Sequence, residues 1–161
     1  MEARIRPYQV TDAADVVRLS LRAWAPVFAS ERDAMGNEIF ERLNGGDWRR
    51  QQQQDVEKVL ADEETRVWVG EMNGQAVGFV AAALKIERGM GEVYMLAVDP
   101  ESQNQGLGTQ LTKVATDWMR EVGLSLALIS TGGDVGHAPA RRTYEKAGYT
   151  PVASVNYFKA L

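Results

Sequence analysis

The segment that most constrains the fold of this chain is the strand candidate Glu92–Val98 together with the helix candidate that follows it. From Val93 onward this strand is apolar at every position, so that both of its faces are apolar. A strand of that kind is covered on both sides, as in the centre of a sheet that carries helices. Asp99-Pro100 ends it, and about Gly106–Val122 reads as a long helix with a continuous apolar stripe. The pair indicates an α/β architecture.

The rest of the chain supplies further strands and helices around this pair. Strands are expected at Ala3–Tyr8, Thr65–Met72, Gln75–Ile86 and Leu124–Ser130, and as a final pair at Tyr149–Ala153 and Asn156–Ala160. A first helix is expected to start at Thr11 or Asp12 and to carry Trp24 and Phe28, with Pro26 breaking or kinking it. Further helices are expected within Arg32–Leu43, from Asp47 to about Ala61, and over Pro139–Ala147. This order predicts an α/β fold with a central mixed β-sheet flanked by helices.

Length and composition narrow the functional classes. The 161 residues correspond to one domain, 1–161, and the absence of cysteine excludes disulfides and a cysteine nucleophile. The net charge of −4 argues against a nucleic-acid partner that is bound through an overall positive charge. The same charge is compatible with a cationic substrate. No spacing of metal ligands is present. Neither an apolar leader nor a membrane-length apolar stretch occurs, so we expect a cytoplasmic protein without a membrane partner.

The junction between the central strand and the long helix has the composition of an anion site. The first turn of a helix has unpaired N–H groups and a partial positive charge. Gly106 and Gly108 leave the backbone there free of Cβ atoms, which suits a phosphate or pyrophosphate. The segment lacks the lysine of a P-loop, and Leu111 replaces the third glycine of the dinucleotide fingerprint. A tight turn without a ligand, or a different nucleotide site, remains an alternative.

Two motifs in series resemble those of the GCN5-related N-acetyltransferase (GNAT) superfamily. Gln103-x-x-Gly106-x-Gly108 resembles its acyl-CoA pyrophosphate motif, and it stands between the central strand and the long helix as in that family. The segment Ala140–Tyr149, which ends in Tyr-Glu-Lys-Ala-Gly-Tyr, resembles the second family motif. The resemblance extends over nearly all of the chain. It implies the GNAT acyl-CoA N-acyltransferase fold and an acetyl-CoA-dependent N-acetyltransferase.

The resemblance also assigns roles in binding acetyl-CoA. It implies that the backbone of the central strand pairs with the pantetheine arm, since a bulge parts this strand from the next, and that an amide near Leu96 faces the thioester oxygen. The helix start would bind the pyrophosphate through main-chain N–H groups and the side chain of Gln103. The cofactor-binding residues expected in this way are Leu96, Ala97, Val98, Gln103, Asn104, Gln105, Gly106, Leu107, Gly108, Thr109, His137 and Ala140. His137 stands where family members often carry Asn, so its role is open.

Acetyl transfer to an amine needs a proton acceptor and a donor near the leaving sulfur. The resemblance places Tyr144 as the acid, and Glu92 occupies a position that several family members use for a base. By simple alternation Glu92 shares a face with Tyr94 and Leu96. Each residue also has a purely structural interpretation. Tyr144 would then be an aromatic side chain packed on an apolar helix face, and Glu92 a solvated carboxylate at the end of its strand. Without cysteine, direct attack of the amine in a ternary complex is the expected route.

The acceptor is less constrained by the sequence. We expect a primary amine on a small molecule or a peptide, in a pocket to which Trp24, Phe28, Trp48 and Tyr157 could contribute an apolar wall. Core packing is the alternative role for these aromatic residues. A homodimer is compatible with the sequence. The alternative function is a catalytically inactive GNAT-fold module that binds acyl-CoA as a sensor or scaffold.

Overall fold

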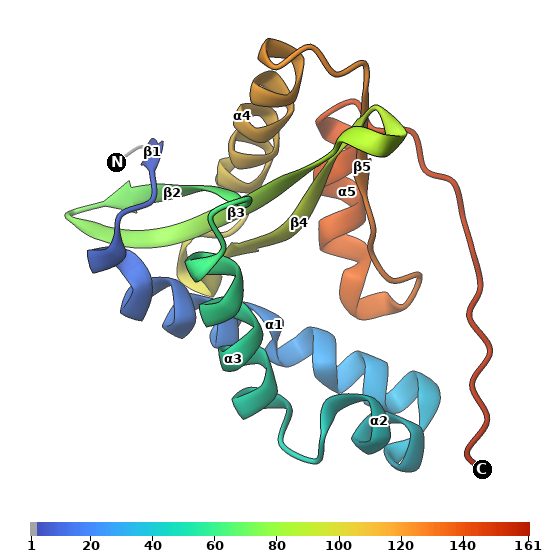
Figure 1. Ribbon diagram of the computed structural model, residues 1–161. Helices are drawn as coiled ribbons and strands as arrows, with labels where there is room; N and C mark the ends of the chain where they lie inside the picture. Colours follow the sequence, from blue (N-terminus) through green and yellow to red (C-terminus); the bar gives the residue numbers. More distant parts are fainter. Residues whose placement is uncertain (1–2) are drawn as a thin grey trace.

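The computed structural model describes residues 3–161 and contains one five-stranded sheet (Figure 1). Its strands are β1 (Arg4–Pro7), β2 (Arg66–Met72), β3 (Gln75–Lys85), β4 (Met90–Val98) and β5 (Leu126–Ile129). They lie in the order β1-β2-β3-β4-β5. The first three pairings are antiparallel, whereas β5 runs parallel to β4. The predicted mixed sheet is therefore confirmed.

Helices cover both faces of this sheet. The helices are α1 (Ala13–Met35), α2 (Asn37–Asn44), α3 (Trp48–Ala61), α4 (Leu107–Glu121) and α5 (Ala138–Lys146). Figure 1 shows α1 and α3 on one side of the sheet and α4 on the other, with α5 near β5. The expected cap of α3 is present, since the Asp47 carboxylate accepts a hydrogen bond from the backbone N–H of Arg50.

Two apolar clusters form the core, one on each face. Leu19 of α1 and Val56 of α3 pack with Phe79 of β3, and all three are fully buried. On the opposite face Leu111 of α4 packs with Val80 of β3. The buried α4 stripe lies where the sequence periodicity places it. Residues of β3 and β4 belong to both clusters, so these two strands lie at the centre of the core.

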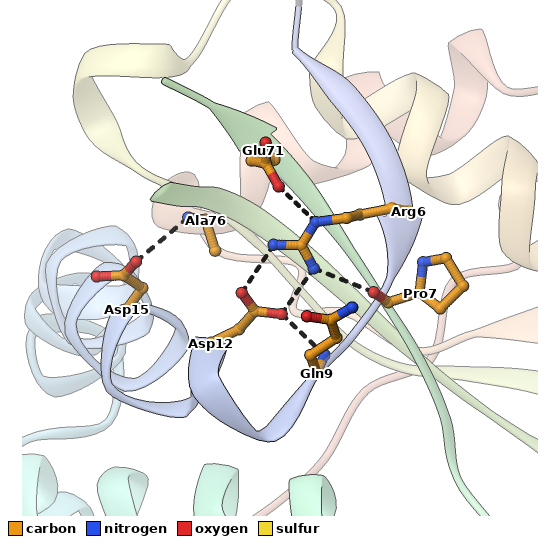
Figure 2. A network of polar contacts seen from close by, with 7 residues as sticks. All are labelled: Arg6, Pro7, Gln9, Asp12, Asp15, Glu71 and Ala76. Atoms are coloured by element: carbon orange, nitrogen blue, oxygen red, sulfur yellow. Dashed lines mark hydrogen bonds and ion pairs between the residues drawn. The ribbon is translucent and has the colours of Figure 1, made fainter. Parts of the chain in front are cut away.

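A polar network joins the neighbouring strands β1 and β2 to the start of α1 (Figure 2). Arg6 of β1 donates two hydrogen bonds of 2.8 Å to Asp12 and a third to Glu71 of β2. Asp12 also accepts a bond from the Gln9 amide. Hydrogen bonds from Arg6 lower the pKa of Asp12, whose side chain is almost fully buried.

The structure corrects two expectations about the elements. Of the break or kink expected at Pro26, the break is absent, since the first helix is continuous from Ala13 to Met35. The final strand pair, Tyr149–Ala153 and Asn156–Ala160, is absent, since residues 147–161 lie in no helix or strand. A strand needs a backbone partner. The described structure has no strand beside this segment, whatever the β-forming tendency of its residues.

Candidate functional site

The central strand β4 is paired along only part of its second edge. It pairs with β3 from Met90 to Val98 but with β5 only from Met90 to Val93. The β5-facing edge of Tyr94–Val98 therefore has no strand partner among the described residues. This is the expected parting of the central strand from its neighbour. It leaves backbone groups of Leu96, Ala97 and Val98 able to pair with an extended ligand.

A bulge in β4 lies where the two strands part. Ala81 of β3 pairs with Met95 and Ala82 pairs with Val93, so Tyr94 has no partner on β3. An extra residue on one strand twists and bends it locally. The bulge coincides with the last pair between β4 and β5, and Tyr94 is 56% exposed there. No local signal in the sequence, such as a glycine, predicts a bulge at this residue.

The bulge also changes the face on which Glu92 lies. Glu92 pairs with Ala83, on the α1 and α3 side of the sheet, whereas Leu96 packs in the α4 cluster. The expectation that Glu92 and Leu96 share a face is therefore wrong, because one extra residue shifts the alternation. Glu92 instead shares the face of Met95 and Ala97.

Glu92 lines a hollow at the open end of this face. The hollow has a volume of about 610 Å³ and is bounded mainly by the ends of β3 and β4, with Lys85 and Leu128 among its lining residues. The Glu92 carboxylate lies 3.4 Å from the Lys85 ammonium, and its side chain is 19% exposed. A carboxylate with one cation and access to solvent can accept a proton directly or through water.

The start of α4 presents unpaired backbone donors. Gly106 is the N-cap, with φ of +82°, and no side chain caps the helix. The first bond within the helix is donated by Gln110 to the Gly106 carbonyl, at 3.1 Å. The N–H groups of Leu107, Gly108 and Thr109 therefore precede the helical ladder. Asn104, Gln105 and Gly106 are exposed in front of them.

An ion pair from α1 fixes the turn before α4. Asp99, which is 6% exposed, receives a hydrogen bond of 2.9 Å from Arg22 and caps the 3₁₀ turn Pro100–Ser102 through the Glu101 amide. Gln103, expected to contact phosphate, donates through Nε2 to the Val98 carbonyl at 3.0 Å. Sequence reasoning missed Arg22, since nothing local links residues 77 positions apart.

The two expected glycines act in different ways. Gly106 adopts a left-handed backbone conformation, and a Cβ atom there would meet nothing within 4 Å. At Gly108 a Cβ atom would lie 3.2 Å from the Thr143 methyl carbon. Gly108 thus allows α5 to pack closely against the start of α4. This packing brings the second motif next to the first.

Tyr144 follows Thr143 on α5 and is half-buried. Burial raises the pKa of Tyr144 to about 12, and Tyr149 adds to this rise. The nearby Tyr149 hydroxyl lies 2.7 Å from the Thr116 hydroxyl of α4, which ties the end of the motif to that helix. Ala140 is half-buried on the same short helix.

His137 is held by carboxylates rather than pointing to an open surface. Its Nδ1 is hydrogen-bonded to Asp134, and its Nε2 lies 3.8 Å from the Glu31 carboxylate of α1. Asp134 also accepts a bond of 2.5 Å from Ser30, whose hydroxyl accepts one from the Gly136 amide. Burial alone raises the pKa of Asp134, but the bonds from Ser30 and His137 outweigh it and lower the value. This cluster joins α1 to the loop before α5.

The four aromatic residues expected as candidates for the wall of an acceptor pocket do not line a common pocket. Phe28 stacks on Trp48 with ring centroids 4.5 Å apart and meets Phe40 edge-on, which joins α1, α2 and α3. Trp24 lies edge-on against Phe79 of the core. Tyr157 lies on the C-terminal segment and is 94% exposed. The structure does not bring these four residues together.

The chain belongs to the acetyltransferase (GNAT) family, whose profile matches residues 30–149. It is similar to a mycothiol acetyltransferase from Beutenbergia cavernae, with 30% identity over 151 residues, which is 93% of this chain. A mycothiol acetyltransferase from Sanguibacter keddieii is 38% identical over 87 residues. The chain spans 46% of the first relative and 27% of the second. The recognised family is thereby confirmed.

Solved structures show the same fold. An aminoglycoside 6′-N-acetyltransferase from Acinetobacter haemolyticus superposes with a TM-score of 0.69 at 16% identity and covers 98% of both chains. The ribosomal-protein-S18-alanine N-acetyltransferase from Escherichia coli gives a TM-score of 0.66 at 18% identity, covering 94% of this chain and 79% of the other. The GNAT-like mixed sheet flanked by helices is therefore confirmed. No helix in residues 3–161 is long and apolar enough to cross a membrane.

Proposed function

We propose that residues 1–161 form one N-acetyltransferase domain that moves an acetyl group from acetyl-CoA to a primary amine. The observation that carries the proposal is the parted β4 edge lying directly before an uncapped helix start, in a chain of the GNAT family. Related structures support it, since one is an aminoglycoside N-acetyltransferase with CoA and another is a PaiA N-acetyltransferase from Thermoplasma acidophilum with coenzyme A.

The start of α4 supplies the donors for the pyrophosphate. The N–H groups of Leu107, Gly108 and Thr109 and the partial positive charge of the helix suit a bound anion. Asn104 and Gln105 lie exposed beside them, and the Gln103 side chain could add a donor by leaving the Val98 carbonyl. This arrangement binds phosphates despite the net charge of −4, because local dipoles outweigh the overall field at this distance.

The unpaired edge of β4 supplies the remaining backbone contacts. Leu96, Ala97 and Val98 can form strand-like hydrogen bonds with the amides of the pantetheine arm. Acetyl-CoA supplies an activated acetyl thioester. An amide near Leu96 that faced its oxygen would stabilise the negative charge that develops there. These roles belong to the backbone, so their side chains matter mainly for packing.

Tyr144 acts as a hydrogen-bond donor to the leaving sulfur. With a pKa of about 12 its hydroxyl stays neutral at physiological pH and keeps its proton to donate. Complete transfer to a thiolate, whose thiol has a pKa near 8.5, is uphill by roughly 5 kcal/mol. We therefore assign Tyr144 to stabilising the sulfur by a hydrogen bond, with the final proton coming from the amine or solvent.

Glu92 is the proposed proton acceptor for the amine. The attacking nitrogen must lose a proton, and the Glu92 carboxylate faces a hollow that reaches solvent. The Lys85 ammonium lies 3.4 Å from this carboxylate. The hollow lies at the start of β4, where β4 is still paired with β5, and Glu92 precedes the parted residues Tyr94–Val98 in the strand.

The acceptor class is a primary amine on a small molecule or peptide. Relatives with named acceptors include both kinds, an aminoglycoside and a ribosomal-protein alanine. The net charge of −4 favours cationic acceptors. We place the protein in the cytoplasm, where acetyl-CoA is available. The position of His137 between Asp134 and Glu31 favours a role in holding α1 against α5 over a direct cofactor contact.

Thiol release from acetyl-CoA, measured with a panel of polyamines, aminoglycosides, amino acids and peptides, tests the proposal. We expect amine-dependent release and an amine product heavier by one acetyl group in the mass spectrum. Saturable acetyl-CoA binding without turnover on the whole panel would favour the inactive sensor module. Absence of acetyl-CoA binding, with ATP and NAD as comparison ligands, would overturn the proposed site.

A further inference from the structure

The loop between β5 and α5 is fastened to α1 by polar side chains. It ends in a 3₁₀ turn, Val135–His137, that leads directly into α5. Figure 1 shows α1 passing close to the start of α5, and α1 contacts this turn. The Ser30 hydroxyl donates a hydrogen bond of 2.5 Å to the Asp134 carboxylate and accepts one of 2.9 Å from the Gly136 amide. A Cβ atom on Gly136 would lie 2.5 Å from the Ser30 Cβ, so glycine permits this close approach.

His137 adds a charge-dependent contact to this junction. Its Nδ1 is hydrogen-bonded to Asp134, and its Nε2 lies 3.8 Å from the Glu31 carboxylate of α1. A neutral imidazole has one N–H donor and one acceptor nitrogen, whereas an ionised carboxylate only accepts. The imidazolium, with an N–H group at both nitrogens, attracts both carboxylates. The contact between the loop and α1 therefore depends on the charge of His137.

The same residues do not form a nucleophilic site. Ser30, Asp134 and His137 are the residue types of a hydrolytic triad, in which the histidine lies between the serine and the carboxylate. Here the carboxylate of Asp134 lies in the middle and is bonded to both other side chains. The Ser30 hydroxyl therefore donates to a carboxylate and has no imidazole to activate it. This arrangement holds elements together.

The loop is tied to α5 as firmly as to α1. Arg141 of α5 donates hydrogen bonds of 2.6 and 2.8 Å to the carbonyls of Gly132 and Asp134. Tyr144 follows Arg141 by three residues, which is about one helical turn. Thr143 packs against the start of α4, where the proposed pyrophosphate donors lie. A shift of the loop away from α1 would therefore displace the helix that borders the cofactor side.

We propose that a latch between α1 and this loop, closed when His137 is charged, strengthens the binding of acetyl-CoA. The latch consists of Ser30, Glu31, Asp134 and His137. These are positioning residues, since they act through the placement of α5 rather than by touching the reacting atoms. The proposal rests on the proposed function for the identity of the ligand, whereas the latch itself is a contact within the chain.

The charged groups around the imidazole define the pH range of the latch. Among the described residues they are Asp134 on its own loop and Glu31 on α1, while the Arg141 guanidinium of α5 is bonded to backbone carbonyls. Burial raises the pKa of Glu31, and the nearby His137 opposes that rise. The latch should be closed above the pH at which Glu31 loses its proton and should open as His137 loses its own.

Proton NMR and calorimetry together test the latch. His137 is the only histidine of the chain, so its imidazole C–H signals report its charge without assignment. CoA, which cannot be turned over, serves as the ligand. The Kd for CoA should rise about five-fold as the histidine loses its proton. A phosphate monoester titrates at about pH 6, so each Kd is compared with that of Glu31→Gln at the same pH.

Glu31→Gln keeps the shape of the side chain and removes its charge. In this variant the histidine signal should still titrate, but the Kd should not follow it. Asp33→Asn, at an exposed position of the same helix, is the control and should behave as the wild type does. The same pH dependence of the Kd in Glu31→Gln and wild type would overturn the coupling to the cofactor side.

A double-mutant cycle tests the latch without a ligand. Urea unfolding of Glu31→Gln, His137→Gln and the double variant is measured on both sides of the histidine transition. The two residues should be coupled by about five-fold in the unfolding equilibrium constant on the acid side and uncoupled on the alkaline side. Coupling that is absent, or equal on both sides, would overturn the latch. Absence of CoA binding in every variant would overturn the proposed function, while this cycle would still decide the latch.

Discussion

The methyl carbon of Thr143, on α5, lies 3.2 Å from the position that a Cβ atom would take on Gly108, in the first turn of α4. The two family motifs meet at this contact. Replacing a helical glycine by alanine normally raises the free energy of unfolding by about 1 kcal/mol. We predict that Gly108→Ala gives no such gain here, because Thr143 must shift. Thermal and urea unfolding of the variant and the wild type measure this difference in the free energy of unfolding.

A double-mutant cycle isolates that contact. In a Thr143→Ala background, which removes the methyl carbon, Gly108→Ala should recover a gain of about 1 kcal/mol. Thr143→Val keeps a carbon at the same place and is the matched control, in which the gain should stay absent. Equal effects of Gly108→Ala in all three backgrounds would mean that Gly108 does not set the spacing of the two helices.

The ion pair between Arg22 and Asp99 holds the turn that precedes α4. Arg22→Met should raise the KM for acetyl-CoA about five-fold, which corresponds to roughly 1 kcal/mol, and leave kcat nearly unchanged. Arg18→Met is the control, since Arg18 lies on the same helix and pairs with Asp15 away from the turn. A fall in kcat at constant KM would point to a catalytic role that we do not assign to Arg22.

Tyr144→Phe should lower kcat by about 10²-fold with little change in the KM for acetyl-CoA. The variant keeps the ring and removes the hydroxyl that faces the leaving sulfur in our proposal. Tyr149→Phe is the matched control: its hydroxyl bonds Thr116, so it should cost about 1 kcal/mol of stability and leave kcat within a few-fold. Similar kinetic losses in both variants would contradict the assignment.

The pKa of Tyr144 also predicts a pH dependence. Since burial raises it to about 12, the hydroxyl stays neutral through pH 10, and no loss of kcat from its ionisation is expected below that pH. The free energy of unfolding should change in the same direction as kcat, because it too falls when the Tyr144 hydroxyl ionises. The buried neutral tyrosine contributes fully below pH 10, the value in the unfolded chain, and its contribution falls as pH rises toward 12. Unfolding of Tyr144→Phe and wild type across pH 8–11 tests it.

The pair of Arg6 and Asp12 predicts the opposite behaviour in acid. Hydrogen bonds from Arg6 lower the pKa of Asp12 below 3.8. Its contribution to stability is therefore complete above pH 3.8 and is lost as pH falls through the lower value of the folded state. Asp12→Asn should reduce stability by about 2–3 kcal/mol at pH 7, and the difference should shrink as pH falls below 3.8. A difference independent of pH would contradict this account.

The sequence predicted the fold well where the signal was local. The apolar stripe of α4 and the start of α3 at Asp47 depend on neighbouring residues, and both are present. Pro26 failed as a break because apolar packing along α1 outweighs the loss of one backbone bond. The final strands failed because a strand needs a partner, which composition does not reveal.

The sequence motifs single out the turn before α4 and Tyr144 as candidates, but they do not predict the features that arrange them. The bulge at Tyr94 reverses the alternation of side chains along β4, so that Glu92 and Leu96 lie on opposite faces of the sheet. No residue type in this strand predicts the bulge. Arg22 reaches Asp99 across 77 positions, so only the folded chain joins them. The sequence pattern does not predict contacts between residues that lie far apart along the chain.

Hydrogen exchange in the presence and absence of acetyl-CoA tests whether the parted β4 edge and the start of α4 bind this ligand. Acetyl-CoA should slow exchange of the amides at Leu107–Thr109 and along Tyr94–Val98, because these groups would become donors to it. The β1 and β2 strands, which lie far from the parted edge in the sheet order, serve as the internal reference and should not change. Binding without protection at either segment, or protection confined to other parts of the chain, would contradict the proposed site.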